Sequence, residues 1–170
     1  MLVSLRAWKK NDREILATLA NNIKIWNNVR DRLPHPYTLQ NADEFIRYCI
    51  APEIPFVLAI EADGKLAGCI GLEMQEDVAR ISAEIGYWIG EPFWGKGIAT
   101  KAVALMMDYV AEHFSCLVRI YAKIFEYNTA SMKVLEKNGF HMECIHRKAV
   151  EKNNKIWDEY VWVKFTDEGK

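Results

Sequence analysis

The stretch AEIGYWIGEPFWGKGIATKAVALMMDYV, residues 83–110, decides how this chain is organised. It begins as an apolar β segment, continues as a loop that carries Gly95 and Gly97, and ends as an amphipathic helix. A glycine turn between a strand and a helix brings several backbone N–H groups to one point, where the helix dipole adds partial positive charge. The stretch therefore predicts a site that holds an anion such as a pyrophosphate without a metal, as a coenzyme-binding enzyme would need.

The glycine loop alone is an ambiguous signal. A G-x-G pattern also occurs in plain tight turns, the dinucleotide pattern G-x-G-x-x-G fails at Thr100, and the Walker pattern is absent. The preceding strand adds to the signal, because Gly86 and Gly90 predict a bulge or a close approach by a ligand. An amide-bearing cofactor arm can pair with the backbone of such a strand as an additional strand would. From these residues, a plain turn and an anion site both remain open.

Composition is that of an ordinary globular protein. The 170 residues fit one domain, and the net charge of -1 gives no general attraction to nucleic acid or to an anionic membrane, so neither is expected as a partner. The four cysteines have no C-x-x-C spacing and the histidines are scattered, so no metal site is expected. Reduced thiols and the lack of a long apolar run near residue 1 predict a cytoplasmic protein.

Short strands and amphipathic helices alternate along the chain. Asp63-Gly64 predicts a tight hairpin turn, and Gly139 predicts the end of a helix, because both positions suit a positive φ. Strands are expected at 3–8, 56–61, 66–73, 80–89, 118–124, 140–150 and 156–165. Helices are expected at 10–19, 23–32, 41–49, 100–113 and 128–138. This order predicts a mixed sheet with helices on its faces, a central strand–helix–strand unit and antiparallel hairpins at both ends.

Three segments of the chain, taken in order, resemble the GNAT superfamily of acetyl-coenzyme-A-dependent N-acetyltransferases, and closely its RimJ/RimL-like branch. They are EIGYWIG at 84–90, FWGKGIAT at 93–100 and NTASMKVLEKNGF at 128–140. The resemblance extends over nearly the whole chain, from the opening strand and helix to the closing hairpin. It implies one α/β (α+β) acetyltransferase domain over residues 1–170, with a mostly antiparallel sheet, helices on both faces and a splayed central strand pair.

The resemblance also implies which residues bind acetyl-CoA, the co-substrate. The pyrophosphate would be held by the loop residues Trp94, Gly95, Lys96, Gly97, Ile98, Ala99 and Thr100, mainly through backbone amides. The pantetheine arm would pair with the end of the strand, at Trp88, Ile89 and Gly90. Asn128 would touch the same arm, and Ser131 would face the thioester sulfur. The family loop usually begins with Gln or Arg, whereas this chain has Trp94; since backbone groups hold the anion, binding is expected to survive this difference.

The implied reaction is attack by an amine on a thioester, and it needs a proton acceptor. An α-amine has a pKa of about 8 and a lysine amine about 10.4, so both are mostly protonated at neutral pH. Glu84 is the first candidate for a catalytic base and Glu73 is the reserve, while a water relay is a further route. A purely structural interpretation, in which Glu84 is a solvated strand carboxylate or a partner of Arg80, stays open.

Two further groups complete the implied chemistry. The backbone N–H of Trp88 or Ile89 would stabilise the developing oxyanion. Ser131, the second candidate catalytic residue, or Tyr127 would supply the proton that the departing thiolate takes up. Ser131 can also belong only to the capped first turn of a helix that begins at Asn128, or act only as a cofactor contact.

The acceptor amine is less well determined than the cofactor. A protein N-terminus, a polyamine, an aminoglycoside and another small amine all fit, and a homodimer is left open. Acceptor residues in this branch come from the first helices and the final hairpin, here Trp26, Arg30, 34–37 and 148–157. The alternative function is a non-catalytic acyl-CoA binding or sensing domain. An ATP-binding protein ranks last, because the chain lacks a Walker lysine and an evident magnesium carboxylate.

Overall fold

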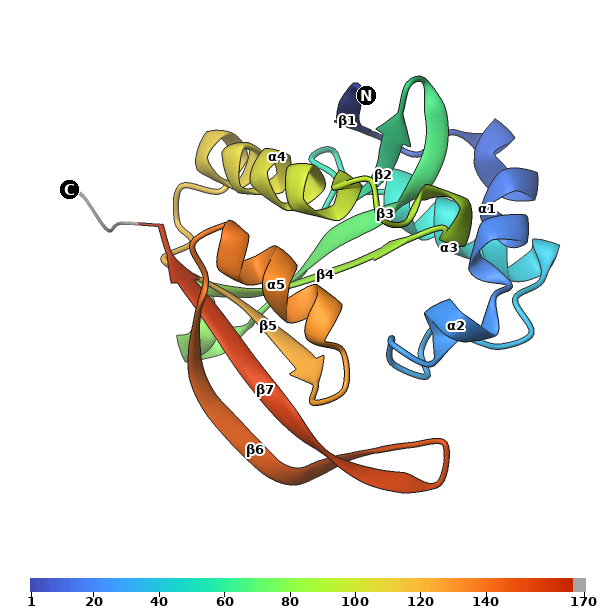
Figure 1. Cartoon of the computed structure of the whole chain (residues 1–170). Helices are drawn as coiled ribbons and strands as arrows, with labels where there is room; N and C mark the ends of the chain where they lie inside the picture. The colour runs from blue at the N-terminus through green and yellow to red at the C-terminus, as the bar shows by residue number, and fades with distance from the viewer. Residues whose placement is uncertain (167–170) are drawn as a thin grey trace. The chain divides into compact units, whose positions relative to one another are not determined.

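The computed structural model describes residues 1–166, and within them it contains seven strands, five α-helices and three 3-10 helices. The strands are β1 (Val3–Arg6), β2 (Val57–Ala62), β3 (Lys65–Met74), β4 (Ser82–Ile89), β5 (Arg119–Phe125), β6 (His141–Lys152) and β7 (Lys155–Phe165). The α-helices are α1 (Arg13–Ala20), α2 (Ile23–Trp26), α3 (Leu39–Ile50), α4 (Ile98–His113) and α5 (Thr129–Lys137). The 3-10 helices are Lys10–Asp12, Asp77–Ala79 and Glu91–Phe93. Figure 1 shows this succession by colour.

The strands follow the order β1-β2-β3-β4-β5-β7-β6 in one sheet. The pairs β1/β2, β2/β3, β5/β7 and β6/β7 are antiparallel, and β4/β5 is parallel. Between β3 and β4, Gln75 N–H donates to Ser82 O, whereas Gly90 N–H donates to Ala67 O. From residue 82 to residue 90 along β4, the partner beside β3 changes from residue 75 to residue 67. The two strands therefore run in opposite directions and are also antiparallel. The mixed fold with a mostly antiparallel sheet is therefore confirmed.

The parallel ladder between β4 and β5 is short. It pairs Ser82–Glu84 with Arg119–Tyr121, and the last pair is Glu84 with Tyr121. Both strands continue beyond that pair, β4 to Ile89 and β5 to Phe125. The ladder therefore covers only the first part of each strand, which is the feature expected of a splayed central pair.

The chain divides into two compact units, and the first comprises residues 1–71 and 87–105. Its core is a cluster of buried side chains from the N-terminal helices and the first strands: Trp8, Leu16, Ala17, Ala20, Tyr37, Ala42, Ile46, Cys49, Ala59, Leu66 and Cys69. The ring of Trp8 meets that of Phe45 edge-on, with centroids 5.4 Å apart. Burial raises the pKa of the Cys49 thiol to about 12, so this cysteine is an inert core residue at neutral pH.

The second unit comprises residues 72–86 and the chain from residue 106 onward. Its dominant element is the long β6–β7 hairpin beside β5 (Figure 1). The hairpin turns at Asn153 and Asn154, whose φ values are +55° and +57°, as a two-residue turn with two left-handed positions requires. Gly139 has φ +78° directly after α5 and its C-cap, as predicted.

The first helices differ from the prediction in their bounds. The segment expected as a helix at 10–19 opens as a 3-10 turn, and α1 begins only at Arg13. Asp12 fixes this turn, because its carboxylate accepts hydrogen bonds from the Lys9 N–H and from Arg6. Burial by itself raises the pKa of Asp12, but these hydrogen bonds outweigh it and hold the pKa below its usual value.

The helix expected at 23–32 is wrong beyond Trp26, where α2 ends. Asparagine side chains compete for backbone hydrogen bonds, and Asn28 Nδ2 donates to Lys24 O at 2.9 Å. The next helix begins earlier than expected, at Leu39, because Thr38 and Asn41 form a reciprocal capping box. Among residues 1–166, no helix combines the length and the apolar character needed to cross a bilayer.

Candidate functional site

Strands β3 and β4 approach each other closely where β4 ends. A Cβ atom added at Gly68 would lie 2.2 Å from the carbonyl oxygen of Trp88 and 3.1 Å from the Cα of Ile89. Glycine is therefore required at position 68 for the backbones to meet. The Gly90 N–H donates to Ala67 O at 2.8 Å and closes the pairing. The loop that follows β4 thus starts from a fixed point on the sheet.

The hydrogen bond of Gly90 sets the direction of the backbone groups before it. Backbone groups of successive strand residues point alternately to the two edges of the strand. The Gly90 N–H and the backbone groups of Trp88 consequently point toward β3, and those of Ile89 point to the opposite edge, while the Gly90 carbonyl accepts from Phe93 N–H in the turn that follows. Of the three residues predicted to pair with the pantetheine arm, Ile89 is the one that presents backbone groups away from β3. The Trp88 side chain packs against the core cluster of the first unit.

The two loop glycines adopt the backbone conformation that a glycine loop needs. Gly95 and Gly97 both have φ +73°, and a Cβ atom at either position would meet nothing within 4 Å. Helix α4 follows at once, and its first hydrogen bond runs from Lys101 N–H to Gly97 O at 3.2 Å. The amides of Ile98 and Ala99 precede that bond, and amides in a first turn have no intrahelical acceptor. N–H groups at a helix start beside open space suit phosphate oxygens.

Trp94 ties the loop to the end of β4. Its indole Nε1–H donates to Ile89 O at 2.6 Å, while the residue as a whole stays 43% exposed. The bond occupies the outward carbonyl of Ile89, so the Ile89 N–H is the outward group that remains for a ligand or an oxyanion. In the sequence, Trp94 is visible only as a departure from the family loop. No periodicity indicates this hydrogen bond, since it joins a loop side chain to a backbone carbonyl five residues earlier.

The lysines of the loop bind backbone carbonyl groups. Lys96 Nζ donates to Pro92 O at 2.9 Å, and Lys101 Nζ donates to Met1 O at 3.1 Å. Glu91, in the 3-10 turn before the loop, accepts from Lys24 Nζ and from Asn22 Nδ2. The hydrogen bond from Lys24 and then that from Asn22 lower the pKa of Glu91. Both lysine ammonium groups thus bond to backbone carbonyls in this structure, and the first amides of α4 add donors of their own.

The candidate base lies where the β4–β5 ladder ends. Glu84 forms the last pair of that ladder, with Tyr121, and its side chain is half-buried. Ala83 and Ile85 are fully buried, so Glu84 projects from the opposite face of the strand. The reserve candidate, Glu73, is exposed on β3. The predicted partner Arg80 instead donates to the backbone carbonyl of Asp77.

Asn128 is the N-cap of α5. Its side-chain oxygen Oδ1 accepts the Ser131 N–H at 3.2 Å, and its own N–H donates to Phe125 O at 2.8 Å. The helix start at Asn128 is as predicted. Capping uses the carbonyl oxygen of the side chain, so the amide nitrogen Nδ2 is the group that can serve a ligand. Glu84, Asn128 and Ser131 belong to the second unit, whereas the loop and the end of β4 belong to the first.

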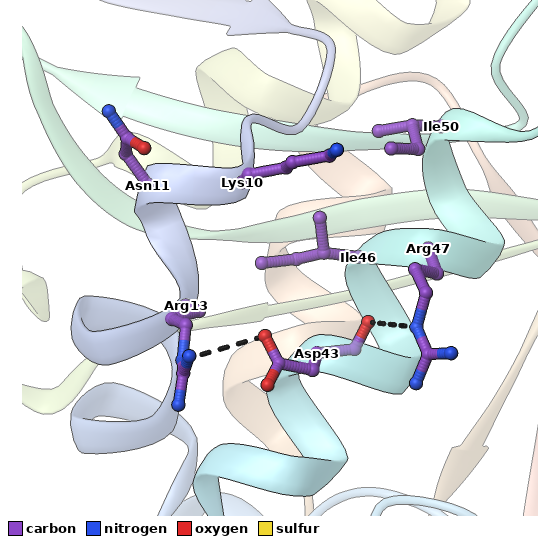
Figure 2. Close-up of a pocket in the computed structure, with 7 residues that line it drawn as sticks. All are labelled: Lys10, Asn11, Arg13, Asp43, Ile46, Arg47 and Ile50. Atoms are coloured by element: carbon purple, nitrogen blue, oxygen red, sulfur yellow. Dashed lines mark hydrogen bonds and ion pairs between the residues drawn. The ribbon is translucent and has the colours of Figure 1, made fainter.

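A hollow of about 510 Å³ lies between the N-terminal turn and α3 (Figure 2). It is lined by Lys10, Asn11, Arg13, Asp43, Ile46, Arg47 and Ile50. Arg13 Nε lies 3.5 Å from Asp43 Oδ1, and Arg47 Nε donates to the Asp43 carbonyl. None of these residues belongs to β4 or to the glycine loop, so the hollow is not the predicted coenzyme site. Residues 1–166 contain no group of three or more His, Cys, Asp or Glu side chains suited to a metal ion.

The chain is similar to known acetyltransferases. The family model described as an acetyltransferase (GNAT) domain matches residues 3–141. The chain is 42% identical over 108 residues to the probable N-acetyltransferase YjcK of Bacillus subtilis. This aligned region covers 64% of the chain and 59% of that protein. It is 28% identical to the spermidine N(1)-acetyltransferase of Escherichia coli K12, over 83% of the chain and 74% of that protein.

Solved structures show the same fold. The ribosomal L7/L12 alpha-N-protein acetyltransferase RimL, in complex with coenzyme A, superposes with a TM-score of 0.84 at 22% identity, over 96% of this chain and 93% of that chain. The match to YjcK spans 59% of the relative's length, so the chain covers about three-fifths of the curated protein it resembles there.

Proposed function

The chain belongs to the family of acetyltransferase (GNAT) domains, and on this premise we propose that it moves an acetyl group from acetyl-CoA to a primary amine. The amine would attack the thioester directly in a ternary complex, within one domain that covers residues 1–170. The observation that carries the proposal is the loop at Gly95 and Gly97, with two left-handed glycines, open space at both Cβ positions and the start of α4 directly behind them.

The loop fits a coenzyme A diphosphate in both space and charge. A bound phosphate oxygen needs N–H donors and room for close approach, and side-chain atoms at positions 95 and 97 would take up that room. Residues Trp94–Thr100 would hold the diphosphate, and the Ile89 N–H would bind the pantetheine arm or the carbonyl oxygen. Asn128 and Ser131 are proposed as further contacts of the same arm. Acetyl-CoA supplies the acetyl group already activated as a thioester.

The residues of the chain would handle the protons of the reaction. As the amine nitrogen forms its bond to the acetyl carbon and the C–S bond breaks, Glu84 would accept the proton that the nitrogen loses, directly or through water. The Ile89 N–H would donate to the oxygen on which negative charge develops. Ser131 would give a proton to the departing sulfur and regain one from water. With these two proton transfers, the product leaves as a neutral amide and coenzyme A leaves as a neutral thiol.

The acceptor is proposed to be an amine, and the relatives support two classes of amine, polyamines and protein N-termini. One relative is named a spermidine acetyltransferase, and one structural neighbour is named a protein N-terminal acetyltransferase. A cytoplasmic location suits the four free cysteines, because thiols persist in reducing compartments. The homodimer and the lack of nucleic-acid and membrane partners stay predictions, which light scattering and binding assays can check.

A thiol-release assay tests the proposed function. Purified protein is incubated with acetyl-CoA and one amine from each class: N-terminal peptides, polyamines, aminoglycosides and small monoamines. Release of coenzyme A thiol that depends on the amine, together with an acetylated amine in the mass spectrum, is the expected result. Acetyl-CoA binding by calorimetry without thiol release from any amine would instead identify a non-catalytic acyl-CoA binding domain. If acetyl-CoA does not bind and no amine releases thiol, both interpretations are refuted.

A further inference from the structure

A buried carboxylate lies on the closing hairpin, at Glu159 on β7. Its side chain is 8% exposed. Within residues 1–166 its carboxylate meets Nδ1 of His146, 3.4 Å from Oε2 and at the long limit of a hydrogen bond, while His146 itself is 46% exposed. A carboxylate withdrawn from water is costly unless a cation or several donors compensate it. Glu159 therefore has more capacity to accept hydrogen bonds than the protein uses.

The neighbouring carboxylate shows what full compensation looks like. Asp158 accepts from Arg147 at 2.5 Å and from the backbone N–H of Lys148 at 2.8 Å. The hydrogen bond from Lys148 and then that from Arg147 lower the pKa of Asp158. Successive residues of a strand face opposite sides, so the two carboxylates serve different faces of the hairpin. The hairpin satisfies Asp158 from its own residues and leaves Glu159 with one weak contact.

Aromatic rings share the face of Glu159. Phe125 on β5 and His146 on β6 both lie directly opposite Glu159 in the ladders, so the three side chains form one row across three strands. Trp157 precedes Glu159 by two residues and projects from the same side of β7. Tyr127 links the set, with its ring 5.6 Å from that of Phe125 and 4.8 Å from that of Trp157. The Trp157 indole is held in turn by a hydrogen bond to the Lys152 carbonyl.

A buried carboxylate beside several aromatic rings has the chemistry of an ammonium-binding site. The carboxylate supplies the charge, and the ring faces attract a cation within about 6 Å of their centroids. We propose that Glu159, with Phe125, Tyr127 and Trp157, binds an alkylammonium group of the acceptor other than the nitrogen that is acetylated. This inference rests on the proposed function and narrows it, because it selects small aliphatic diamines and polyamines over monoamines.

A matched pair of acceptors measures the contribution of the second ammonium group. Putrescine and butylamine differ mainly in that group, so the ratio of their kcat/KM values in the thiol-release assay isolates it. The wild-type protein is expected to prefer putrescine by roughly 10- to 100-fold, the range for one hydrogen bond to a charged partner. In Glu159→Gln, putrescine loses this advantage and butylamine changes by less than about twofold. An equal preference for the two amines in the wild type would overturn the proposal.

Two variants separate the subsite from general effects. Glu136→Gln removes the same charge from an exposed position on α5, outside the segments named for acceptor binding, and should keep the wild-type ratio. Glu159→Asp keeps the charge on a shorter side chain and should recover part of the preference for putrescine. If Glu159→Gln lowers kcat/KM for both amines equally, or leaves both unchanged, Glu159 does not bind the second ammonium group.

The inference can also fail separately from the proposed function. If no amine releases thiol from acetyl-CoA, calorimetry with putrescine and spermidine on the coenzyme-loaded protein still tests the subsite. Binding that weakens at least about tenfold in Glu159→Gln but not in Glu136→Gln would support it. Undetectable binding of both amines to the wild type would overturn it. A peptide pair with lysine or norleucine after the N-terminal residue shows whether a lysine side chain can take the place of the small diamine.

Discussion

Replacing Gly97 by alanine should separate the anion site from the fold. Gly97 has φ +73°, and its Cβ position is open, with no atom within 4 Å. The added methyl group therefore meets no steric clash in the protein alone. The cost to folding is the left-handed backbone of a residue with a Cβ, about 1–2 kcal/mol. For a chain of this size, that free energy lowers Tm by about 2–8 °C.

Gly97→Ala should also weaken coenzyme binding, by more than the loss of folding stability alone would explain. If a phosphate oxygen lies against Gly97, the methyl group displaces it from at least one backbone N–H. A hydrogen bond to a charged partner contributes about 1.5–3 kcal/mol, which corresponds to roughly 10- to 100-fold in Kd. Gly95→Ala should behave in the same way, because Gly95 has the same φ and equally open space.

The chain offers a closely matched control in Gly64. This residue lies in the β2–β3 turn with φ +74°, and its Cβ position is also open. Gly64→Ala should lower Tm by a similar amount, since the same strain is introduced, but coenzyme affinity should stay unchanged. Thermal unfolding gives the first quantity, and calorimetry with coenzyme A gives the second. Equal Kd values in Gly97→Ala and Gly64→Ala would show that the coenzyme does not use this loop.

Three further substitutions test the neighbouring groups. Trp94→Phe removes the indole donor of Ile89 O, so we expect the protein to lose about 1 kcal/mol of unfolding free energy and to bind coenzyme A more weakly. Urea unfolding measures the stability, and calorimetry on the folded protein measures the affinity. An unchanged affinity for coenzyme A would contradict a role for that bond in shaping the loop. Glu84→Gln should lower kcat about 100-fold while leaving the Kd of coenzyme A within about twofold, and equal turnover would exclude Glu84 as the base. Asp12 has a lowered pKa in the folded protein, so its ion pair with Arg6 stabilises the fold above the usual value of 3.8 and is lost as the pH falls below it. Urea unfolding should therefore show Asp12→Asn less stable than wild type at pH 7 and closer to it near pH 3, and a constant difference would refute the assignment.

Local signals were enough to predict much of the fold. Asp63-Gly64 gives the β2–β3 turn with φ values of +49° and +74°, and Gly139 ends α5 at φ +78°. These positions need a left-handed backbone that few residues adopt, so sequence and conformation correspond closely. The helix that follows the glycine loop was also predicted, because its apolar stripe is long. It begins at Ile98 rather than Thr100, since the buried Ile98 already belongs to the first turn.

The remaining features depend on contacts between residues that are distant in the chain or on different strands. The need for glycine at position 68 arises from the carbonyl of Trp88 on the next strand, and no local pattern contains that distance. Glu159 looks like an ordinary hairpin carboxylate until the ladders place Phe125 and His146 opposite it. Helix α2 stops at Trp26 because asparagine side chains compete for backbone groups, and a stripe of apolar residues does not record this competition.

The glycine loop is held at both ends, and this bears on how it would bind a coenzyme. Before the loop, Gly90 is bonded to Ala67, and Trp94 is bonded to Ile89. After the loop, the side chain of Ile98 is buried at 2% exposure. A loop fixed in this way loses little conformational entropy when an anion binds, so more of the interaction energy is retained as affinity. We therefore expect Trp94 to compensate for the missing Gln or Arg by ordering the backbone donors instead of adding one of its own.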